Sequence, residues 1–188
     1  FHDEVLSIRV PMIGRHSVHT ILRAAAVGLV EGMTWQEIIH GLQRGHSQLR
    51  LVAVHTEDGA LILDDSYNAS PESTLAALNL LDELEGRKVA VLGDMLELGQ
   101  YEKQGHRMVG VRAADVADYL VTVGALGKLI AEAAVEAGMP ANKVTCAEDV
   151  SAAIEILNQM LVSGDVALVK GSHSLRMDRI VTALEVGE

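Results

Sequence analysis

Apolar and polar residues follow two different rhythms along this chain, and the change falls near residue 45. Within residues 17–31 the apolar side chains recur every three or four positions, which predicts a helix, and a second, shorter helix is predicted over 35–42. Residues 5–10 alternate in the manner of a strand. One strand and two helices cannot enclose a core, so we interpret residues 1–44 as the remnant of a larger domain.

Beyond residue 45, short apolar runs alternate with longer helical segments. A hairpin is expected first, with strands at 51–55 and 60–63 and Asp58-Gly59 in its turn. The later strands are expected at 88–92, 119–123, 143–145 and 166–169. The helices are expected at 72–84, 101–117, 126–137, 149–162 and 173–185. This alternation predicts a doubly wound α/β domain over residues 45–188, with a mostly parallel sheet covered on both faces.

Composition narrows the classes of function. Hydrophobic residues make up 49% of the chain and charged residues 22%, which is typical of a folded globular protein. The net charge of −11 disfavours nucleic-acid binding over a broad face, because such a face must be basic. The one cysteine, Cys146, excludes a disulfide scaffold and is typical of a reducing compartment.

The chain also lacks the usual targeting signals. No apolar run approaches the length of about 18–20 residues that a membrane span needs. The first residues, 1–5, contain neither Met nor a basic region, so we expect no signal peptide and interpret the chain as the tail of a longer protein. A cytoplasmic location without membrane or nucleic-acid partners is therefore expected.

Polar clusters follow several of the predicted strands at their carboxyl ends. They are residues 64–68, residues 93–97, Gly124 and residues 170–172. Ligands bind beyond the carboxyl ends of the strands in open parallel sheets, so we expect a ligand site along this edge. The acids of the first cluster can take ribose hydroxyls or help to hold Mg²⁺, or they can belong to a solvated turn. The cation of the last cluster suits a phosphate or carboxylate, or merely precedes a helix.

Arg50 and Asp65 flank the predicted hairpin and should therefore be neighbours in space. Such a pair is either a structural ion pair or a holder for the phosphate and ribose of one nucleotide. No P-loop string of the form Gly-x-x-x-x-Gly-Lys-Ser/Thr occurs in the chain. The histidines show no metal-ligand spacing, so no metal site is expected. His106 and His173 lie near the polar edge and either bind ligand or start helices.

Three strings within these clusters resemble motifs from the C-terminal part of the Mur ligases. They are Asp-Asp-Ser-Tyr-Asn-Ala-Ser-Pro at 64–71, Val-Leu-Gly-Asp-Met-Leu-Glu-Leu-Gly at 91–99 and Val-Lys-Gly-Ser at 169–172. They keep the order and approximate separations of the family, and the resemblance covers residues 45–188. Upstream, residues 14–20 look like the end of the central ATPase domain of that family. Within the family, the strings are most similar to those of the ligases that add a dipeptide.

The resemblance implies an ATP-dependent ligase of cytoplasmic peptidoglycan precursor synthesis. In this reaction ATP phosphorylates the carboxylate of UDP-MurNAc-tripeptide, and the amine of D-Ala-D-Ala then displaces phosphate. The family also requires Mg²⁺, whose ligands would lie mostly outside this chain, and a monomeric enzyme is expected. Because the P-loop is missing, we expect the chain alone to be inactive.

The resemblance also assigns roles to individual residues. Arg50 matches the arginine that contacts an ATP phosphate, and Asp65 matches the acid that takes the ribose hydroxyls. The other residues on the nucleotide side are Tyr67, Asn68 and His16. The residues on the dipeptide side are Asp94, Glu97, His106, Lys170 and Ser172.

Two departures from the family pattern and three alternatives remain open. Ser17 and Thr20 stand where the family usually has Asn near the adenine, so that contact would be made differently. Ser70 replaces the second Asn of an Asn-Ala-Asn-Pro string but can still cap a helix. The alternatives are a ligase of the Mur, folyl or cyanophycin type with another substrate, a module that only binds, and a phospho-receiver signalling domain. In a receiver domain, however, Asp94 would not follow the very next strand after Asp65.

Overall fold

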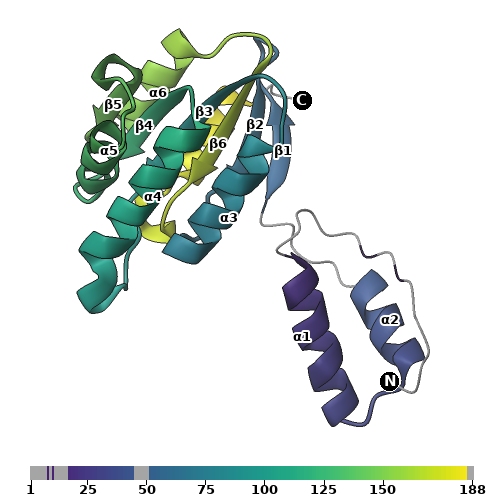
Figure 1. The fold of residues 1–188 in the computed structure, drawn as a ribbon. Helices are drawn as coiled ribbons and strands as arrows, with labels where there is room; N and C mark the ends of the chain where they lie inside the picture. The colour runs from purple at the N-terminus through teal and green to yellow at the C-terminus, as the bar shows by residue number, and fades with distance from the viewer. Residues whose placement is uncertain (1–7, 9, 11–16, 45–50, 186–188) are drawn as a thin grey trace. The chain divides into compact units, whose positions relative to one another are not determined.

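The computed structural model describes residues 8, 10, 17–44 and 51–185 (Figure 1). The chain divides into two compact units, one within residues 1–49 and one within residues 50–188. Most of the strand predicted at 5–10 lies outside the described residues, and the two that are described, Ile8 and Val10, belong to no strand.

The first unit contains the two predicted helices, α1 (Ser17–Val30) and α2 (Trp35–Arg44). Helix α2 begins with a capping box, in which the carboxylate of Glu37 accepts a hydrogen bond from the backbone N–H of Thr34 at 2.8 Å. This bond lowers the pKa of Glu37. The helices approach closely at Gly28, where a Cβ would lie 2.9 Å from Cγ1 of Ile38. The unit is therefore a helical hairpin fixed by one cap and one close contact.

The second unit is built on a six-stranded sheet in the order β1-β2-β6-β3-β4-β5 (Figure 1). The strands are β1 (Val52–His55), β2 (Leu61–Asp65), β3 (Arg87–Gly93), β4 (Tyr119–Val123), β5 (Val144–Ala147) and β6 (Asp165–Lys170). The first strand pairs antiparallel with β2, and all the other neighbours are parallel. This arrangement confirms the prediction of a mostly parallel α/β sheet.

Five helices cover the two faces of the sheet. On one face α3 (Pro71–Asp82), α4 (Glu102–Val116) and α5 (Gly127–Glu136) pack against side chains such as Ala90, Leu92 and Leu168. On the other face α6 (Val150–Met160) and α7 (Asp178–Leu184) pack against the alternate strand residues, such as Val89, Val91 and Val169. Because both faces are buried, the central strands read as continuous apolar runs.

Two predicted helix boundaries are confirmed in detail. Helix α3 starts at Pro71 after the N-cap Ser70, whose hydroxyl accepts a hydrogen bond from the N–H of Ser73. Helix α5 is followed by Gly138 with φ of 108° and then by Pro140.

The last predicted helix, at 173–185, is wrong at its start. Residues His173–Leu175 form a 3-10 turn, and Arg176 then takes the left-handed conformation with φ of 57°. Helix α7 begins only at Asp178. The left-handed residue breaks the helical path and lets the side chain of Met177 enter the core, where it is fully buried.

Strand β6 lies between β2 and β3, and this placement creates the site. The chain leaves β2 and β3 toward the face of α3, α4 and α5, whereas it leaves β6 toward the opposite face (Figure 1). Such reversals open a crevice at the carboxyl ends of the strands. On each side of β6, therefore, neighbouring strands lead at the carboxyl edge into loops that leave toward opposite faces.

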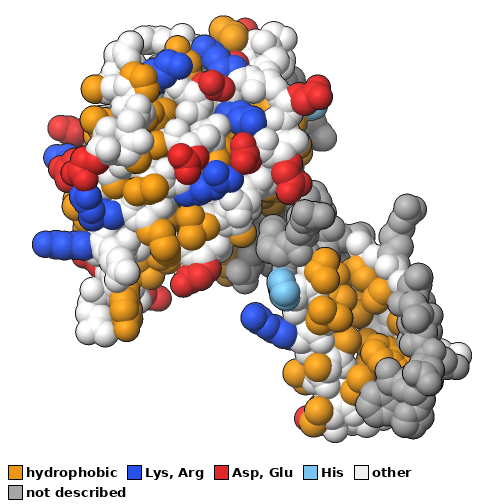
Figure 2. Space-filling view, viewed as in Figure 1, with side chains coloured by type: hydrophobic (Ala, Val, Ile, Leu, Met, Phe, Trp, Pro, Cys, Tyr) orange, Lys and Arg blue, Asp and Glu red, His pale blue; other side chains and the backbone are white. Residues whose placement is uncertain are grey.

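The surface over the three-helix face carries acidic and basic side chains interspersed with each other (Figure 2). This face lacks the broad basic area that nucleic-acid binding requires. In the part of the chain that the structure describes, no helix is long and apolar enough to cross a membrane.

Candidate functional site

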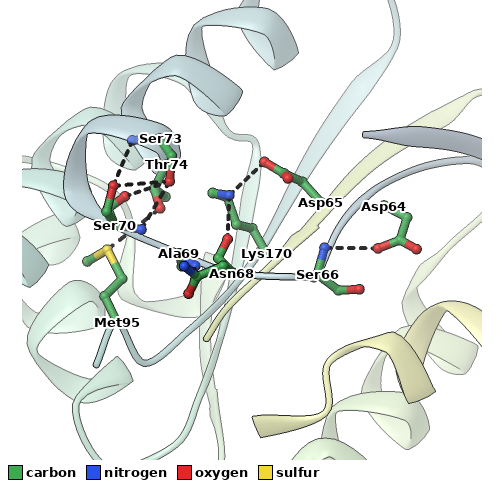
Figure 3. Close-up of polar contacts among 10 residues, drawn as sticks. All are labelled: Asp64, Asp65, Ser66, Asn68, Ala69, Ser70, Ser73, Thr74, Met95 and Lys170. Atoms are coloured by element: carbon green, nitrogen blue, oxygen red, sulfur yellow. Dashed lines mark hydrogen bonds and ion pairs between the residues drawn. The ribbon is translucent and has the colours of Figure 1, made fainter. Parts of the chain in front are cut away.

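A buried ion pair lies at the carboxyl ends of β2 and β6. The parallel register places Asp65, the last residue of β2, beside Lys170, the last residue of β6. Nζ of Lys170 donates to Oδ2 of Asp65 at 2.6 Å and to the backbone oxygen of Asn68 at 2.8 Å (Figure 3). The lysine side chain is 2% exposed and the aspartate side chain 15%. One ammonium thus ties a strand end to the loop that follows it.

The loop after β2 is shaped by short side chains that bond to the backbone nearby. Oδ1 of Asp64 accepts from the N–H of Ser66 at 2.9 Å, and Oδ1 of Asn68 accepts from the N–H of Ala69 at 2.9 Å. Figure 3 shows Asp64 directed toward Ser66 and Asp65 directed toward Lys170. The two neighbouring acids therefore have different tasks, and Asp64 stabilises the turn.

An aromatic contact joins the loop that follows β2 to the loop that follows β6. Tyr67 follows β2, His173 follows β6, and their ring centroids are 5.5 Å apart with the planes tilted by 48°. The tyrosine side chain is 56% exposed. Its ring is thus available as a surface for a base or ribose at the edge of the sheet.

The carboxyl ends of β6 and β3 are closely packed against each other and against Met177. A Cβ on Gly171 would lie 2.8 Å from Cγ of Met177 and 3.2 Å from Cα of Gly93. Asp94 is buried, and its Oδ1 accepts from the N–H of Gly127 at the start of α5, at 2.7 Å. The backbone oxygen of Asp94 accepts from the N–H of Ser172 at 3.0 Å. Asp94 therefore caps a helix and joins two strand ends.

The loop at 94–98 is held from both sides. Nε2 of the fully buried His106 accepts from the N–H of Met95 at 2.9 Å, and its Nδ1 donates to the backbone oxygen of Glu102 at 2.7 Å. These partners assign the neutral ring with its proton on Nδ1. The hydroxyl of Ser172 accepts from the N–H of Leu96 at 2.9 Å. Glu97 is exposed on this loop and takes a left-handed conformation with φ of 64°.

The predicted site residues fall into two groups in the structure. One group lies at the carboxyl ends of β2 and β6, where Lys170 contacts both Asp65 and Asn68. Tyr67 lies on the loop that carries Asn68. A second group, formed by Asp94, His106 and Ser172, surrounds the loop that carries Glu97. Lys170, placed on the dipeptide side by resemblance, thus contacts the nucleotide-side residues. Arg50 and His16 lie outside the described residues.

One contributor escaped the reasoning from sequence: Gly127, whose N–H donates to Asp94. Gly124, predicted at this edge because it follows a strand, has φ of 96° and leaves room for the same carboxylate, since a Cβ there would lie 2.6 Å from it. Among the described residues, no three His, Cys, Asp or Glu side chains gather into a group that could hold a metal ion.

Comparison with known proteins identifies a family model, relatives and solved structures that match this chain. The family model described as "Mur ligase, glutamate ligase domain" matches residues 49–173. The UDP-N-acetylmuramoyl-tripeptide–D-alanyl-D-alanine ligases of Bacillus subtilis and Escherichia coli are each 34% identical, over 93% and 96% of the chain respectively. The crystal structure of MurF from Acinetobacter baumannii superposes with a TM-score of 0.76 at 30% identity over 94% of the chain. The chain spans 39% of the length of each of these proteins.

Proposed function

The chain belongs to the Mur ligase family, and from this premise we propose that it is the C-terminal part of a ligase that joins D-Ala-D-Ala to UDP-MurNAc-tripeptide. With the family established, the phospho-receiver alternative falls away. The observation that carries the proposal is the Asp65 carboxylate, held by Lys170 at the carboxyl ends of β2 and β6. At the carboxyl ends of β2 and β6 the chain leaves toward opposite faces of the sheet, and a carboxylate at such a place is suited to the hydroxyls of a nucleotide ribose.

The proposed reaction consumes ATP and forms one amide bond. The terminal phosphoryl group of ATP passes to the tripeptide carboxylate and gives an acyl phosphate and ADP. The amine of D-Ala-D-Ala then attacks the acyl carbon, the new C–N bond forms, the C–O bond to phosphate breaks and the amine loses a proton. In this chain Asp65 accepts hydrogen bonds from the ribose hydroxyls, Arg50 pairs with a phosphate, and Tyr67 and Asn68 line the nucleotide.

The loop at 94–98 is the proposed dipeptide side. Glu97 is exposed there and offers a carboxylate to the ammonium group of the incoming D-Ala-D-Ala. Asp94, His106 and Ser172 hold the loop in place through the hydrogen bonds described above. Their part is therefore to position the loop.

We assign residues 1–44, which include His16, to the end of the central ATPase domain and residues 45–188 to the C-terminal domain of a cytoplasmic, monomeric enzyme. The P-loop, the Mg²⁺ ligands and the UDP-sugar site belong to parts of the ligase outside these 188 residues. The chain by itself is then expected to bind nucleotide weakly and to form no product, because the phosphate-binding loop is supplied elsewhere.

The test is phosphate release by the full-length ligase with ATP and UDP-MurNAc-tripeptide, in the presence and absence of D-Ala-D-Ala. We expect release to depend on the dipeptide. Asp65→Ala should raise the KM for ATP about tenfold or more, because it removes charge-assisted hydrogen bonds to the ribose. Asp82→Ala, which removes an exposed carboxylate at the opposite edge of the sheet, is the matched control and should leave the KM unchanged.

Two results would contradict the proposal separately. Phosphate release that ignores D-Ala-D-Ala would remove the substrate assignment. An Asp65→Ala enzyme with a normal KM for ATP would leave the ligase activity standing and reduce Asp65 to the structural partner of Lys170.

A further inference from the structure

The geometry points to Lys170 as the residue that positions Asp65 for the nucleotide ribose, an inference that rests on the proposed function. Lys170 makes two hydrogen bonds that belong together: one to the Asp65 carboxylate at 2.6 Å and one to the Asn68 carbonyl at 2.8 Å (Figure 3). The first contact engages Oδ2 of Asp65, so the lysine restrains the position of that carboxylate at the end of β2.

Burial separates the roles of the two partners. The Lys170 side chain is 2% exposed, whereas that of Asp65 is 15% exposed, so the carboxylate is the partner nearer the surface. A buried ammonium needs compensating acceptors, and Asp65 and Asn68 supply them. At 2% exposed, the Lys170 side chain is shielded from a dipeptide or a phosphate, and Asp65 is the more exposed partner. Its action on a ligand is therefore indirect and passes through Asp65.

The bond to Asn68 extends this control to the next loop. Residues 66–69 carry Tyr67, whose exposed ring lies beside His173. Because Lys170 holds the backbone at Asn68, the same ammonium fixes the carboxylate and the start of the loop beside it. We therefore place Lys170 on the nucleotide side of the site as a positioning residue, in place of the dipeptide-side role that the resemblance implied.

The experiment is a double-mutant cycle in the full-length ligase with Lys170→Met, Asp65→Asn and the double variant. Lys170→Met keeps the length of the side chain and removes the charge. We expect it to raise the KM for ATP about tenfold, the effect of losing the orientation of one charged hydrogen-bonding group, and to leave the KM for D-Ala-D-Ala unchanged. The double variant should match Asp65→Asn within about twofold, because Lys170 acts through Asp65.

A second readout uses 2′-deoxy-ATP and 3′-deoxy-ATP. The wild-type enzyme should discriminate against at least one of them by about tenfold, and Lys170→Met should lose most of that discrimination, which a general loss of stability would not cause. Lys170→Arg retains a charge and should keep part of the discrimination; it replaces Lys170→Met in the cycle if that variant does not fold. Lys88→Met is the matched control. Lys88 also donates to a backbone oxygen, that of Asp82, but it lies near the amino end of β3, away from the carboxyl ends of the strands.

Three outcomes would overturn the assignment. The first is a raised KM for D-Ala-D-Ala in Lys170→Met. The second is a double variant in which the effects of the two single variants on the KM for ATP add as free energies, and the third is a Lys170→Met enzyme that discriminates between ATP and the deoxy analogues as the wild type does. Failure of the proposed function is recognised independently, because the wild-type enzyme would then show no ligation that depends on ATP and D-Ala-D-Ala.

Discussion

Strand β6 carries an ion pair at each end, and the two pairs differ in which partner is buried. At the amino end, Asp165 is 2% exposed and its partner Arg87 is 35% exposed. At the carboxyl end, Lys170 is 2% exposed and its partner Asp65 is 15% exposed. The carboxylate is the inner partner in the first pair and the outer partner in the second.

This reversal separates a pair that serves the fold from a pair that can serve a ligand. Asp165 accepts from Nε of Arg87 at 2.8 Å, from Nη2 at 2.5 Å and from the N–H of Val162 at 2.8 Å. Arg87 also donates to the backbone oxygen of Met160 at 2.7 Å, and the hydrogen bond with Asp165 raises the pKa of Arg87. The pair at the amino end thus joins β3, β6 and the end of α6. In the pair at the carboxyl end the carboxylate is instead the more exposed partner, as the proposed ribose site requires.

The largest effect on stability is expected from Asp165→Asn. The amide cannot accept both bonds from Arg87 and also bond to Val162, so the buried end of the network loses its partners. We expect the free energy of unfolding to fall by about 2–4 kcal/mol, below the full cost of breaking a buried pair because Arg87 can hydrate. Urea unfolding followed by circular dichroism measures this loss.

Asp82→Asn is the matched control for that variant. Asp82 is 46% exposed and pairs with Arg112 and Lys88 on the surface, so its removal should change the free energy of unfolding by less than about 1 kcal/mol. Two results would contradict the distinction between the two ends of β6. One is an equal loss in the free energy of unfolding for Asp165→Asn and Asp82→Asn, and the other is a raised KM for ATP in the Asp165→Asn form of the full-length ligase.

Arg87→Lys tests the comparison more finely, because it gives the pair at the amino end the same residue types as the other pair. A lysine cannot reproduce the two-pronged contact with Asp165 and also donate to Met160 in the same geometry. We expect a loss of about 1 kcal/mol by urea unfolding, which is the typical net contribution of one hydrogen bond. A loss as large as that of Asp165→Asn would show that the arginine and not the carboxylate dominates this pair.

The fold could be predicted from the sequence wherever the signal is local. The helix starts at Thr34 and at Ser70-Pro71 follow from capping, and the sheet class follows from the alternation of strands and helices. The position of β6 between β2 and β3 could not be predicted, because it depends on pairing between distant segments. The late start of α7 also escaped prediction, because Arg176 carries no signal for the left-handed conformation that it adopts.

The location of the candidate site could be predicted more readily than the contacts between its residues. Its position at the carboxyl edge follows from the topology of parallel sheets, and Asp65 and Lys170 both belong to polar clusters that follow predicted strands. Their ion pair joins residues 105 positions apart and depends on strand order, which local patterns do not encode. His106 looked like a ligand-binding or helix-start residue, but burial and two backbone partners make it a support for the loop at 94–98.

The smallest effect is expected from Arg176→Gln, which removes an ion pair just beyond β6 whose partners are both exposed. Arg176 and Asp178 are 59% and 49% exposed, and they form two bonds, of 3.0 and 3.1 Å. The hydrogen bond from Arg176 lowers the pKa of Asp178 from its ordinary value of 3.8. The pair therefore stabilises the fold above that value, and its contribution disappears as the pH falls through the lowered pKa.

Urea unfolding of the wild type and Arg176→Gln at neutral and acidic pH tests this expectation. The two proteins should differ slightly at neutral pH, by less than Arg87→Lys differs from the wild type, because solvent screens an exposed pair. The difference should vanish in acid, where Asp178 is protonated in both proteins. A difference that persists in acid would mean that Arg176 contributes through its left-handed backbone or its packing, and a large difference at neutral pH would mean that burial does not set the strength of the ion pairs around β6.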